Sequence, residues 1–564
     1  MKRKSHGFPT TMRYNESESD DDLVISNLFA DFFASNYAKN DLPHATYPYN
    51  IDSYLISDPI INESVVRDNM MSLKPCFSAG PDNIPSFILK RFCDILSVPV
   101  TYLFNLSFNL GVFPKLWKSS YVIPFNKSGS KVDIKNYRCI SRLSALPKLF
   151  EQVLTSQLAF NLQNIISPNQ HGFMRGKSTT TNLLQFVSCV VDGFASGLCT
   201  DTIYLDCEKA FDRVCQVLLL FKCDKIGLSP KMCKWLSSYL KNRTQRVLFK
   251  QSLSQEINVC SGVPQGSHLG PLLFLIYLND LPTVIKKCNI LLFADDVKLF
   301  YTYSDNHEPL QNDLDNVVEW CRINEMNLNL SKCKSMSFSR VAVRNVEYKI
   351  GDYTLESVSS FVDLGVTMDP KLKFNLHVTK IVSKATCTLG FIKRWAKEFK
   401  DPYATKALFT GAVRPILEYA SVVWCPRYQT YSNAIESVQK QFLLFCLRRF
   451  DWNPNLPLPS YLSRLKLIDL PPLFARRTML NISFVHNILN GTTTSQFLLD
   501  RIAINVPFRE SRNYRFFYLE YFRYNYLNDD PFRSALLDFN VFYNQIDFSV
   551  PVYKLKRNIL SVLS

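Results

Sequence analysis

Phe293-Ala294-Asp295-Asp296 places two adjacent carboxylates between two apolar runs, residues 290–292 and 297–300. Strand-like flanks around a short polar turn predict a β-hairpin with both aspartates at its tip. Like charges at this distance repel each other, so such a tip favours a bound cation. A solvated turn without a ligand is the alternative for this tetrapeptide taken alone.

A second acidic segment lies upstream, where the apolar residues 203–205 lead into Asp206. If Asp206 lies beside Asp295, the two carboxylates could hold two Mg²⁺ ions about 3.5–4 Å apart, as in polymerases. Oxygen ligands suit Mg²⁺, which keeps waters and substrate phosphates in its shell. The sequence therefore predicts Asp206 and Asp295 as catalytic metal ligands, with the adjacent Asp296 as a weaker third catalytic ligand and Mn²⁺ as a substitute ion.

Seven motifs, including these two, follow one another in the central part of the chain. In chain order they are NYRCIS at 136–141, QHGF at 170–173, the Asp206 segment, GVPQGSHLGP at 262–271, FADD at 293–296, NLSK at 329–332 and FVDLGV at 361–366. The series resembles the reverse transcriptase of non-LTR retrotransposons, closest to jockey-like lineages, and covers roughly residues 78–377. Cys139 departs from the family, which usually has a proline beside Arg138 to restrict the backbone.

The resemblance implies an α+β fold, a right-hand polymerase with fingers, palm and thumb and a helical C-terminal extension. The expected regions are a partly disordered N-terminal extension (1–65, with an acidic stretch at 16–22), fingers and palm (66–370), a helical basic thumb (371–450) and a helical region without an assigned role (451–564).

The resemblance also implies residues that bind the incoming nucleotide. Lys127 and Arg138 would hold the triphosphate, because lysine offers a point charge and arginine a bidentate fork. Phe211 resembles a steric gate, an aromatic ring under the sugar that excludes a 2′-hydroxyl. Surface cations and a core phenylalanine are the alternative readings of these three residues.

Three more residues complete the predicted site. Gln265 and Gly266 would approach the template base or the nucleotide closely, and an ordinary turn is the alternative. Lys332 resembles the lysine that protonates the pyrophosphate leaving group, and a plain surface lysine is the alternative.

The resemblance implies RNA-directed DNA synthesis on the RNA of a retrotransposon, primed by a nicked target end. The expected partners are an RNA template, a DNA primer or nicked target DNA, and dNTPs. The alternatives are a catalytically silent or host-adapted nucleic-acid-binding remnant, or a group II intron-type maturase. Only about 65 residues precede the expected fingers and palm region, so we expect no endonuclease domain in this chain.

Composition fits a polyanionic partner. The formal net charge is +16, and residues 371–450 hold fourteen Lys and Arg against four Asp and Glu. The sixteen cysteines form no C-x-x-C pair, which argues against a zinc finger and against a disulfide framework. The longest apolar run, 269–278, is shorter than the roughly 20 residues needed to span a bilayer. We therefore expect an intracellular protein with no membrane partner, nuclear when active and cytoplasmic during assembly with RNA.

Overall fold

A five-stranded sheet, here called the central sheet, lies in the middle of the chain with strand order β14-β11-β5-β10-β9. The bounds are β5 Cys199–Leu205, β9 Asn289–Phe293, β10 Asp296–Tyr303, β11 Lys334–Phe338 and β14 Glu356–Ser357. Neighbouring strands are antiparallel except β11 and β14. The computed structural model describes residues 7–38, 47–127, 129–340, 346–399, 401–426, 428–449, 457–506, 515–520, 522, 524–528 and 530–563.

Successive residues of the central sheet face two different hydrophobic cores. Ile203 and Leu205 belong to one core, whereas Tyr204 between them belongs to the other. The same alternation separates Leu292 from Leu291, as expected for strands buried on both faces. Helices α8, α10 and α11 contribute to the first core and α6 to the second. Their bounds are α6 Thr179–Ala195, α8 Gln216–Lys225, α10 Leu269–Leu278 and α11 Glu308–Ile323.

A second sheet, here called the N-terminal sheet, has the order β4-β3-β6-β7, with β8 also paired to β6. The bounds are β3 Ser119–Asn126, β4 Tyr137–Arg142, β6 Arg243–Phe249, β7 Ser252–Leu253 and β8 Ile257–Val259. Helix α1 (Asp22–Ala34) covers this sheet, and Phe29 packs on Tyr137 and Phe249. Cys139 is buried in the same core, so β4 remains a paired strand without the family's proline.

The N-terminal residues are more ordered than the sequence predicted. Strand β1 (Met12–Tyr14) pairs with β2 (Ser17–Ser19), which lies within the stretch 16–22 that we expected to be disordered. Asp21 caps α1 by accepting hydrogen bonds from the amides of Leu23 and Val24. The acidic residues therefore act locally, as a hairpin and a helix cap, because carboxylates suit helix N-termini. Residues 1–6 and 39–46 lie outside the described residues.

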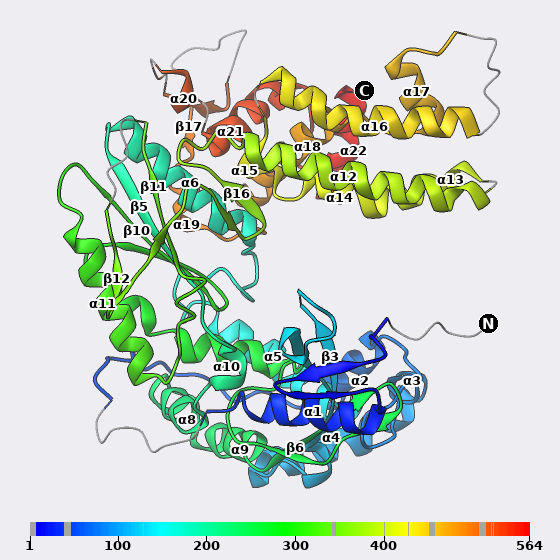
Figure 1. Cartoon of the computed structure of the whole chain (residues 1–564), viewed down its shortest axis with the longest axis vertical. Coiled ribbons are helices and arrows are strands. Elements are labelled where there is room, and N and C mark those ends of the chain that lie inside the picture. Colours follow the sequence, from blue (N-terminus) through cyan, green and yellow to red (C-terminus); the bar gives the residue numbers. More distant parts are fainter. Residues whose placement is uncertain are drawn as a thin grey trace.

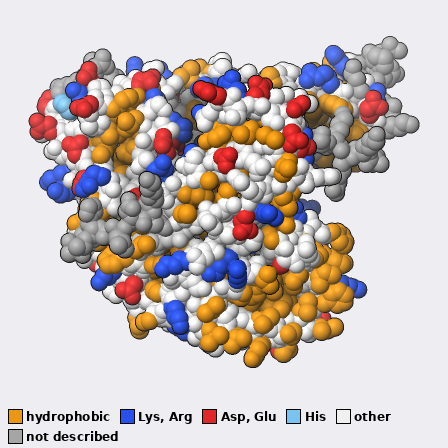
Figure 2. All heavy atoms as spheres, turned by 60° about the horizontal axis from the view of Figure 1, so that its bottom comes forward, with side chains coloured by type: hydrophobic (Ala, Val, Ile, Leu, Met, Phe, Trp, Pro, Cys, Tyr) orange, Lys and Arg blue, Asp and Glu red, His pale blue; other side chains and the backbone are white. Residues whose placement is uncertain are grey.

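A further group of helices contributes to the first core, together with α8 and α10. They are α2 Glu63–Ser72, α3 Ser86–Arg91, α4 Cys93–Leu110, α5 Ala145–Leu162 and α9 Pro230–Leu240. One side of α4 is apolar and open to solvent, with Ile95 73%, Val98 58% and Tyr102 67% exposed. Figure 2 shows a broad hydrophobic area over this part of the molecule.

The C-terminal helices lie together at the top of Figure 1, with the central sheet at the left and the N-terminal sheet below. The bounds are α12 Asn375–Trp395, α13 Pro402–Leu408, α14 Arg414–Glu418, α15 Ser421–Trp424, α16 Gln429–Arg449, α17 Tyr461–Ile468, α18 Leu473–Leu489, α19 Gln496–Leu499, α20 Asn525–Asn528, α21 Pro531–Phe542 and α22 Val552–Leu563. A π-helix, Phe409–Val413, joins α13 to α14. A single core runs through α6, α12, α16, α18, α21 and α22, so the regions 371–450 and 451–564 pack as one body.

Helices and largely antiparallel sheets thus occur together in one chain, which agrees with the predicted α+β class. Small hairpins complete the fold: β12 Lys349–Ile350 with β13 Tyr353–Thr354, β15 Phe361–Asp363 with β16 Val366–Met368, and β17 Ala503–Ile504 with β18 Phe517–Tyr518. Within the described ranges, no helix is both long enough and apolar enough to cross a membrane.

Candidate active site

The predicted hairpin is present. Strands β9 and β10 pair up to Phe293 and Asp296, which leaves Ala294 and Asp295 as the two residues of the turn. Strand β10 also pairs with β5, where Val297 lies opposite Leu205. Because Asp206 directly follows Leu205, this register brings Asp206 beside the turn. The structure thus gathers the three predicted carboxylates at one end of the central sheet.

The carboxylates influence one another electrostatically. Burial, followed by the charge of Asp206, raises the pKa of Asp295. Burial and then the charges of Asp295, Asp363 and Asp206 raise the pKa of Asp296 to about 6. A divalent cation would relieve this repulsion, so the donor set has the chemistry that Mg²⁺ requires.

Lys332 lies at the same site. Its ammonium donates to Asp206 Oδ2 at 2.7 Å, and the two side chains are 51% and 31% exposed. The loop that carries Lys332 is held in place because the Asn329 amide donates to the Asp206 carbonyl at 2.8 Å. Among the residues that the structure describes, no three His, Cys, Asp or Glu side chains are already arranged around a metal position. Lys332 would therefore compete with a metal ion for Asp206 Oδ2.

Cations from the N-terminal sheet converge on these carboxylates. Lys127 follows β3 directly, and its amide donates to the carbonyl of Asn136, just before β4, at 2.9 Å. Burial and the charges of Arg138 and Lys332 lower the pKa of Lys127, while Asp206 and Asp295 oppose that change. Lys127 and Arg138 therefore lie near the aspartates, on the other side of the site.

Phe211 lies on the short helix α7 (Ala210–Arg213), which begins four residues after Asp206. Its ring is half-buried and stacks on Phe274, with the ring centroids 4.3 Å apart. The ring of Phe173 meets that of Phe211 edge-on, with the ring centroids 6.1 Å apart. The Phe173 side chain is 59% exposed, and its backbone has a positive φ of 56°. A bulky residue seldom adopts this backbone conformation outside functional sites. The sequence marked QHGF as a motif but not Phe173 as a site residue.

Gln265 and Gly266 join the two sheets. The side-chain amide of Gln265 donates to Asp212 Oδ1 at 2.7 Å. The backbone carbonyl of Gln265 accepts from the Ser141 amide at 2.9 Å. Gly266 has a φ of 111°, and a Cβ there would lie 2.6 Å from the Ser141 carbonyl oxygen. Gln265 and Gly266 thus both make close backbone contacts, and their partner is Ser141 of the same chain. Burial raises the pKa of Asp212 to about 6.

A buried ion pair that sequence reasoning missed lies beneath the hairpin. Lys298 of β10 pairs with Asp363 of β15, and its ammonium also donates to Asn182 Oδ1 at 3.2 Å. The only signal of this ion pair in the sequence is a lysine within an otherwise apolar strand. The sequence did not show which acidic residue pairs with that lysine. Near this pair lies a pocket of about 550 Å³, whose lining includes Asp206, Asp296, Lys332, Phe361, Asp363 and Leu364.

The elevated pKa of Asp296 predicts how stability changes with pH. The pKa of Asp296 is about 6 in the folded protein and 3.8 in the unfolded chain, so the folded state prefers the protonated carboxyl. The resulting contribution to stability is complete below pH 3.8 and is lost as the pH rises through about 6. Without divalent metal, Asp296→Asn should therefore raise Tm near pH 7.5 by about 1–3 °C and change it little near pH 4. Thermal unfolding in EDTA checks this, with Asp352→Asn in the exposed β12–β13 turn as the control. A lower Tm at pH 7.5 would contradict the electrostatic account.

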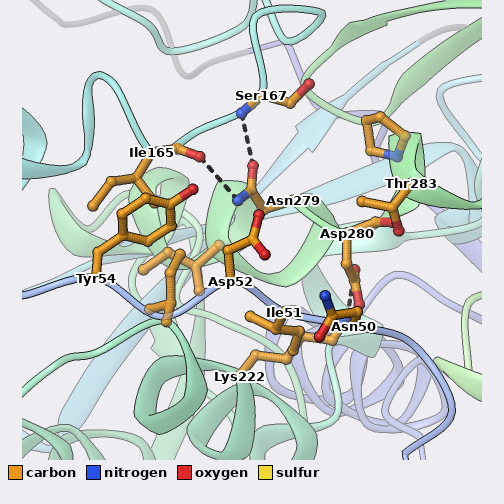
Figure 3. Close-up of a pocket in the computed structure, with 13 residues that line it drawn as sticks. Asn50, Ile51, Asp52, Tyr54, Ile165, Ser167, Lys222, Asn279, Asp280 and Thr283 are labelled. Carbon is orange, nitrogen blue, oxygen red and sulfur yellow. Dashed lines mark hydrogen bonds and ion pairs between the residues drawn. The ribbon is translucent and has the colours of Figure 1, made fainter.

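A second, smaller cavity of about 240 Å³ lies between α8, α10 and the residues 50–54 (Figure 3). Lys222 at its base donates to the carbonyl of Tyr277 at 2.7 Å and to Asp280 at 2.8 Å, while Trp320 also donates to Asp280. Burial lowers the pKa of Lys222 to about 8. Asn279 bonds the backbone of Ser167 and Ile165. These mutual bonds indicate a structural joint between helices rather than a second catalytic centre.

Comparisons with known proteins agree with this geometry. Residues 125–374 match the family model described as reverse transcriptase (RNA-dependent DNA polymerase). The chain is 27% identical over 401 residues to the "Probable RNA-directed DNA polymerase from transposon BS" of Drosophila melanogaster, an alignment that covers 68% of this chain and 44% of the relative. It is 26% identical over 443 residues to the RNA-directed DNA polymerase from mobile element jockey of the same species, covering 75% and 48%.

The jockey polymerase of Drosophila funebris is 26% identical over 410 residues, which cover 69% of this chain and 44% of that relative. The chain thus spans less than half the length of these curated relatives. The matched family covers both aspartate segments and the strands that place them. Residues 125–374 thus match the reverse transcriptase family model, and the chain is similar to the RNA-directed DNA polymerases of transposon BS and mobile element jockey.

Proposed function

We propose that this chain is an RNA-directed DNA polymerase that copies element RNA from a DNA primer or a nicked target end. The observation that carries the proposal is the convergence of Asp206, Asp295 and Asp296 from two paired strands, opposite the cations Lys127 and Arg138. In this proposal the central sheet is the palm, the N-terminal sheet with its helices is the fingers, and α12–α16 form the thumb.

Each residue has a defined task in the proposed reaction. Mg²⁺ held by Asp206 and Asp295, or Mn²⁺ in its place, would neutralise charge on the reacting phosphate and lower the pKa of the primer 3′-hydroxyl. Lys127 and Arg138 hold the triphosphate by charge-assisted hydrogen bonds. Lys332, displaced from Asp206, remains close enough to donate a proton to the departing pyrophosphate.

The sugar and the template are recognised by other parts of the site. Phe211 selects deoxyribose because its ring, fixed on Phe274, leaves no room for a 2′-hydroxyl. Gln265 and Gly266 keep the loop close to both sheets, so that its backbone borders the nucleotide.

Primer extension tests the proposal directly. Purified protein with Mg²⁺ and dTTP should extend oligo(dT) on poly(rA), and omitting Mg²⁺ should stop the reaction. We expect the same protein to leave supercoiled plasmid uncut, because the proposed reaction starts from a primer end or from a target that is already nicked. Tight binding of the primer–template without any extension would instead support a silent nucleic-acid-binding remnant.

The thumb assignment predicts a change in salt dependence. Lys380 and Lys384 lie one turn apart on the exposed side of α12, near the exposed rings of Phe391 and Trp395. Replacing both lysines with Ala should make the slope of log affinity against log salt shallower by about 1.4–1.8, since fewer counterions are released.

Fluorescence anisotropy with a labelled RNA–DNA hybrid gives this slope. Lys286 and Lys287 form the matched control, because they are exposed in the loop before β9, at the end of that strand away from the aspartates. Their double Ala variant should keep the wild-type slope. An unchanged slope in the α12 variant would remove α12 from the duplex-binding surface.

A further inference from the structure

The turn that carries Asp295 depends on an unusual backbone conformation. Ala294, the first of its two loop residues, has a φ of 56°. Two-residue hairpin loops with a positive φ at the first position normally place glycine there, because a Cβ is disfavoured in this region. Contacts from outside the hairpin are therefore needed to keep Ala294 in this conformation and Asp295 facing Asp206.

Gln170 makes these contacts. Its side-chain oxygen accepts the amide of Ala294 at 2.9 Å and that of Gly172 at 2.8 Å. Its side-chain nitrogen lies 3.4 Å from the Ala294 carbonyl, at the long end of the hydrogen-bond range. The residue is only 2% exposed, so these bonds form away from competing water. One side chain thus bonds both backbone groups of the strained residue.

The segment around Gln170 is itself fixed against β9. The Leu292 amide donates to the Asn169 carbonyl at 2.9 Å, and the His171 amide donates to the Leu292 carbonyl at 2.9 Å. Gly172 then passes directly under the turn, where an added Cβ would lie 2.3 Å from the Ala294 nitrogen. The segment 169–172 therefore lies where it can fix the position and the orientation of the Ala294–Asp295 turn.

We propose that Gln170 is a positioning residue for the metal site: it holds Ala294 in the left-handed conformation and so orients Asp295 toward Asp206. Gln170 acts through Ala294 and contacts no substrate in the proposed reaction. The proposal rests on the proposed function, because it takes Asp295 as a metal ligand. In this proposal the QHGF motif supports the turn that carries Asp295, a role that the sequence of the motif did not indicate.

Gln170→Leu tests this role, because leucine has a similar size but cannot bond Ala294. We expect its affinity for Mn²⁺ to fall by about tenfold or more, as read from the EPR signal of free Mn²⁺ with primer–template bound. The kcat for extension should fall about 10- to 100-fold while the KM for dTTP changes less than threefold. Gln170→Asn, which keeps the amide but shortens its reach, should shift both values in the same direction if Gln170→Leu does not fold.

Gln157 supplies a matched control. Its amide also bonds both backbone groups of one residue, accepting from Ile60 N and donating to Ile60 O, both at 2.8 Å, on the solvent-exposed side of α5. Because these bonds are exposed to solvent, Gln157→Leu should lower stability less than Gln170→Leu, and it should leave Mn²⁺ affinity and the Mg²⁺ dependence of extension unchanged.

A second substitution separates positioning from general stability. Glycine adopts the left-handed conformation freely, so Ala294→Gly should restore much of the Mn²⁺ affinity lost in Gln170→Leu. Wild-type Mn²⁺ affinity in folded Gln170→Leu, or a loss that Ala294→Gly does not relieve, would overturn the proposal. Wild-type protein that binds Mn²⁺ but extends no primer would instead refute the proposed function and leave the Gln170 result interpretable.

Discussion

Asp295→Asn should abolish DNA synthesis, with extension on an RNA template falling by about 10³-fold or more. The amide has nearly the shape of the carboxylate but lacks its negative charge, so the site can no longer hold divalent cations between this turn and Asp206. Affinity for the primer–template should stay nearly unchanged, because most of that binding comes from phosphate contacts elsewhere. Single-turnover extension and anisotropy measure the two quantities separately.

The control for this substitution is Asp352→Asn, a carboxylate-to-amide change in the exposed β12–β13 turn. It should extend primers like the wild type. Extension by Asp295→Asn within tenfold of the wild-type rate would mean that the two-aspartate site is not where synthesis takes place.

Phe211→Val should weaken discrimination against ribonucleotides. Overlap of one heavy atom in a packed site costs about 1–3 kcal/mol, which corresponds to roughly ten- to a hundredfold in selectivity. Because Phe211 is stacked on Phe274, its ring has little freedom to move aside for a 2′-hydroxyl. The measurement is the ratio of kcat/KM for dCTP to that for CTP on one RNA template, which should fall toward unity.

Shortening a half-buried aromatic ring also lowers stability, so Phe211→Val needs a matched control. Phe221 is likewise half-buried against the same core but packs on Tyr47, far from the aspartates in the fold. Phe221→Val should lose comparable stability and keep the wild-type dCTP/CTP ratio. If Phe211→Val also keeps that ratio, Phe211 is a core residue and the preference for DNA lies elsewhere.

Local signals in the sequence were sufficient to predict the aspartate hairpin. Apolar flanks and a short turn predicted strands on both sides of Asp295, which are β9 and β10. The apolar run into Asp206 predicted β5, the strand that pairs with β10. Lys332 also lies beside Asp206, although its role as a proton donor stays a prediction. The strands and the turn follow from alternation and turn chemistry within about ten residues, whereas Lys332, 126 positions from Asp206, was predicted from the family resemblance.

Contacts between distant segments could not be predicted in the same way. Gln170 bonds a residue 124 positions away, and the sequence presented its motif only as a polar segment with glycines. The partner of Lys298 likewise depends on how β15 packs on the central sheet. At 16–22 the acidic composition predicted disorder, but this segment is ordered by pairing of Ser17–Ser19 with Met12–Tyr14 and by the Asp21 cap of α1.

Iron-mediated cleavage tests the metal site most directly, because it reports where a divalent cation binds whether or not synthesis occurs. Fe²⁺ with ascorbate and peroxide produces hydroxyl radicals that cut the backbone next to the bound ion. The account predicts cuts near Asp206 and near Asp295, both suppressed by excess Mg²⁺ and lost in Asp206→Asn. Cuts confined to other segments, or cuts at these two positions that persist in Asp206→Asn, would contradict it.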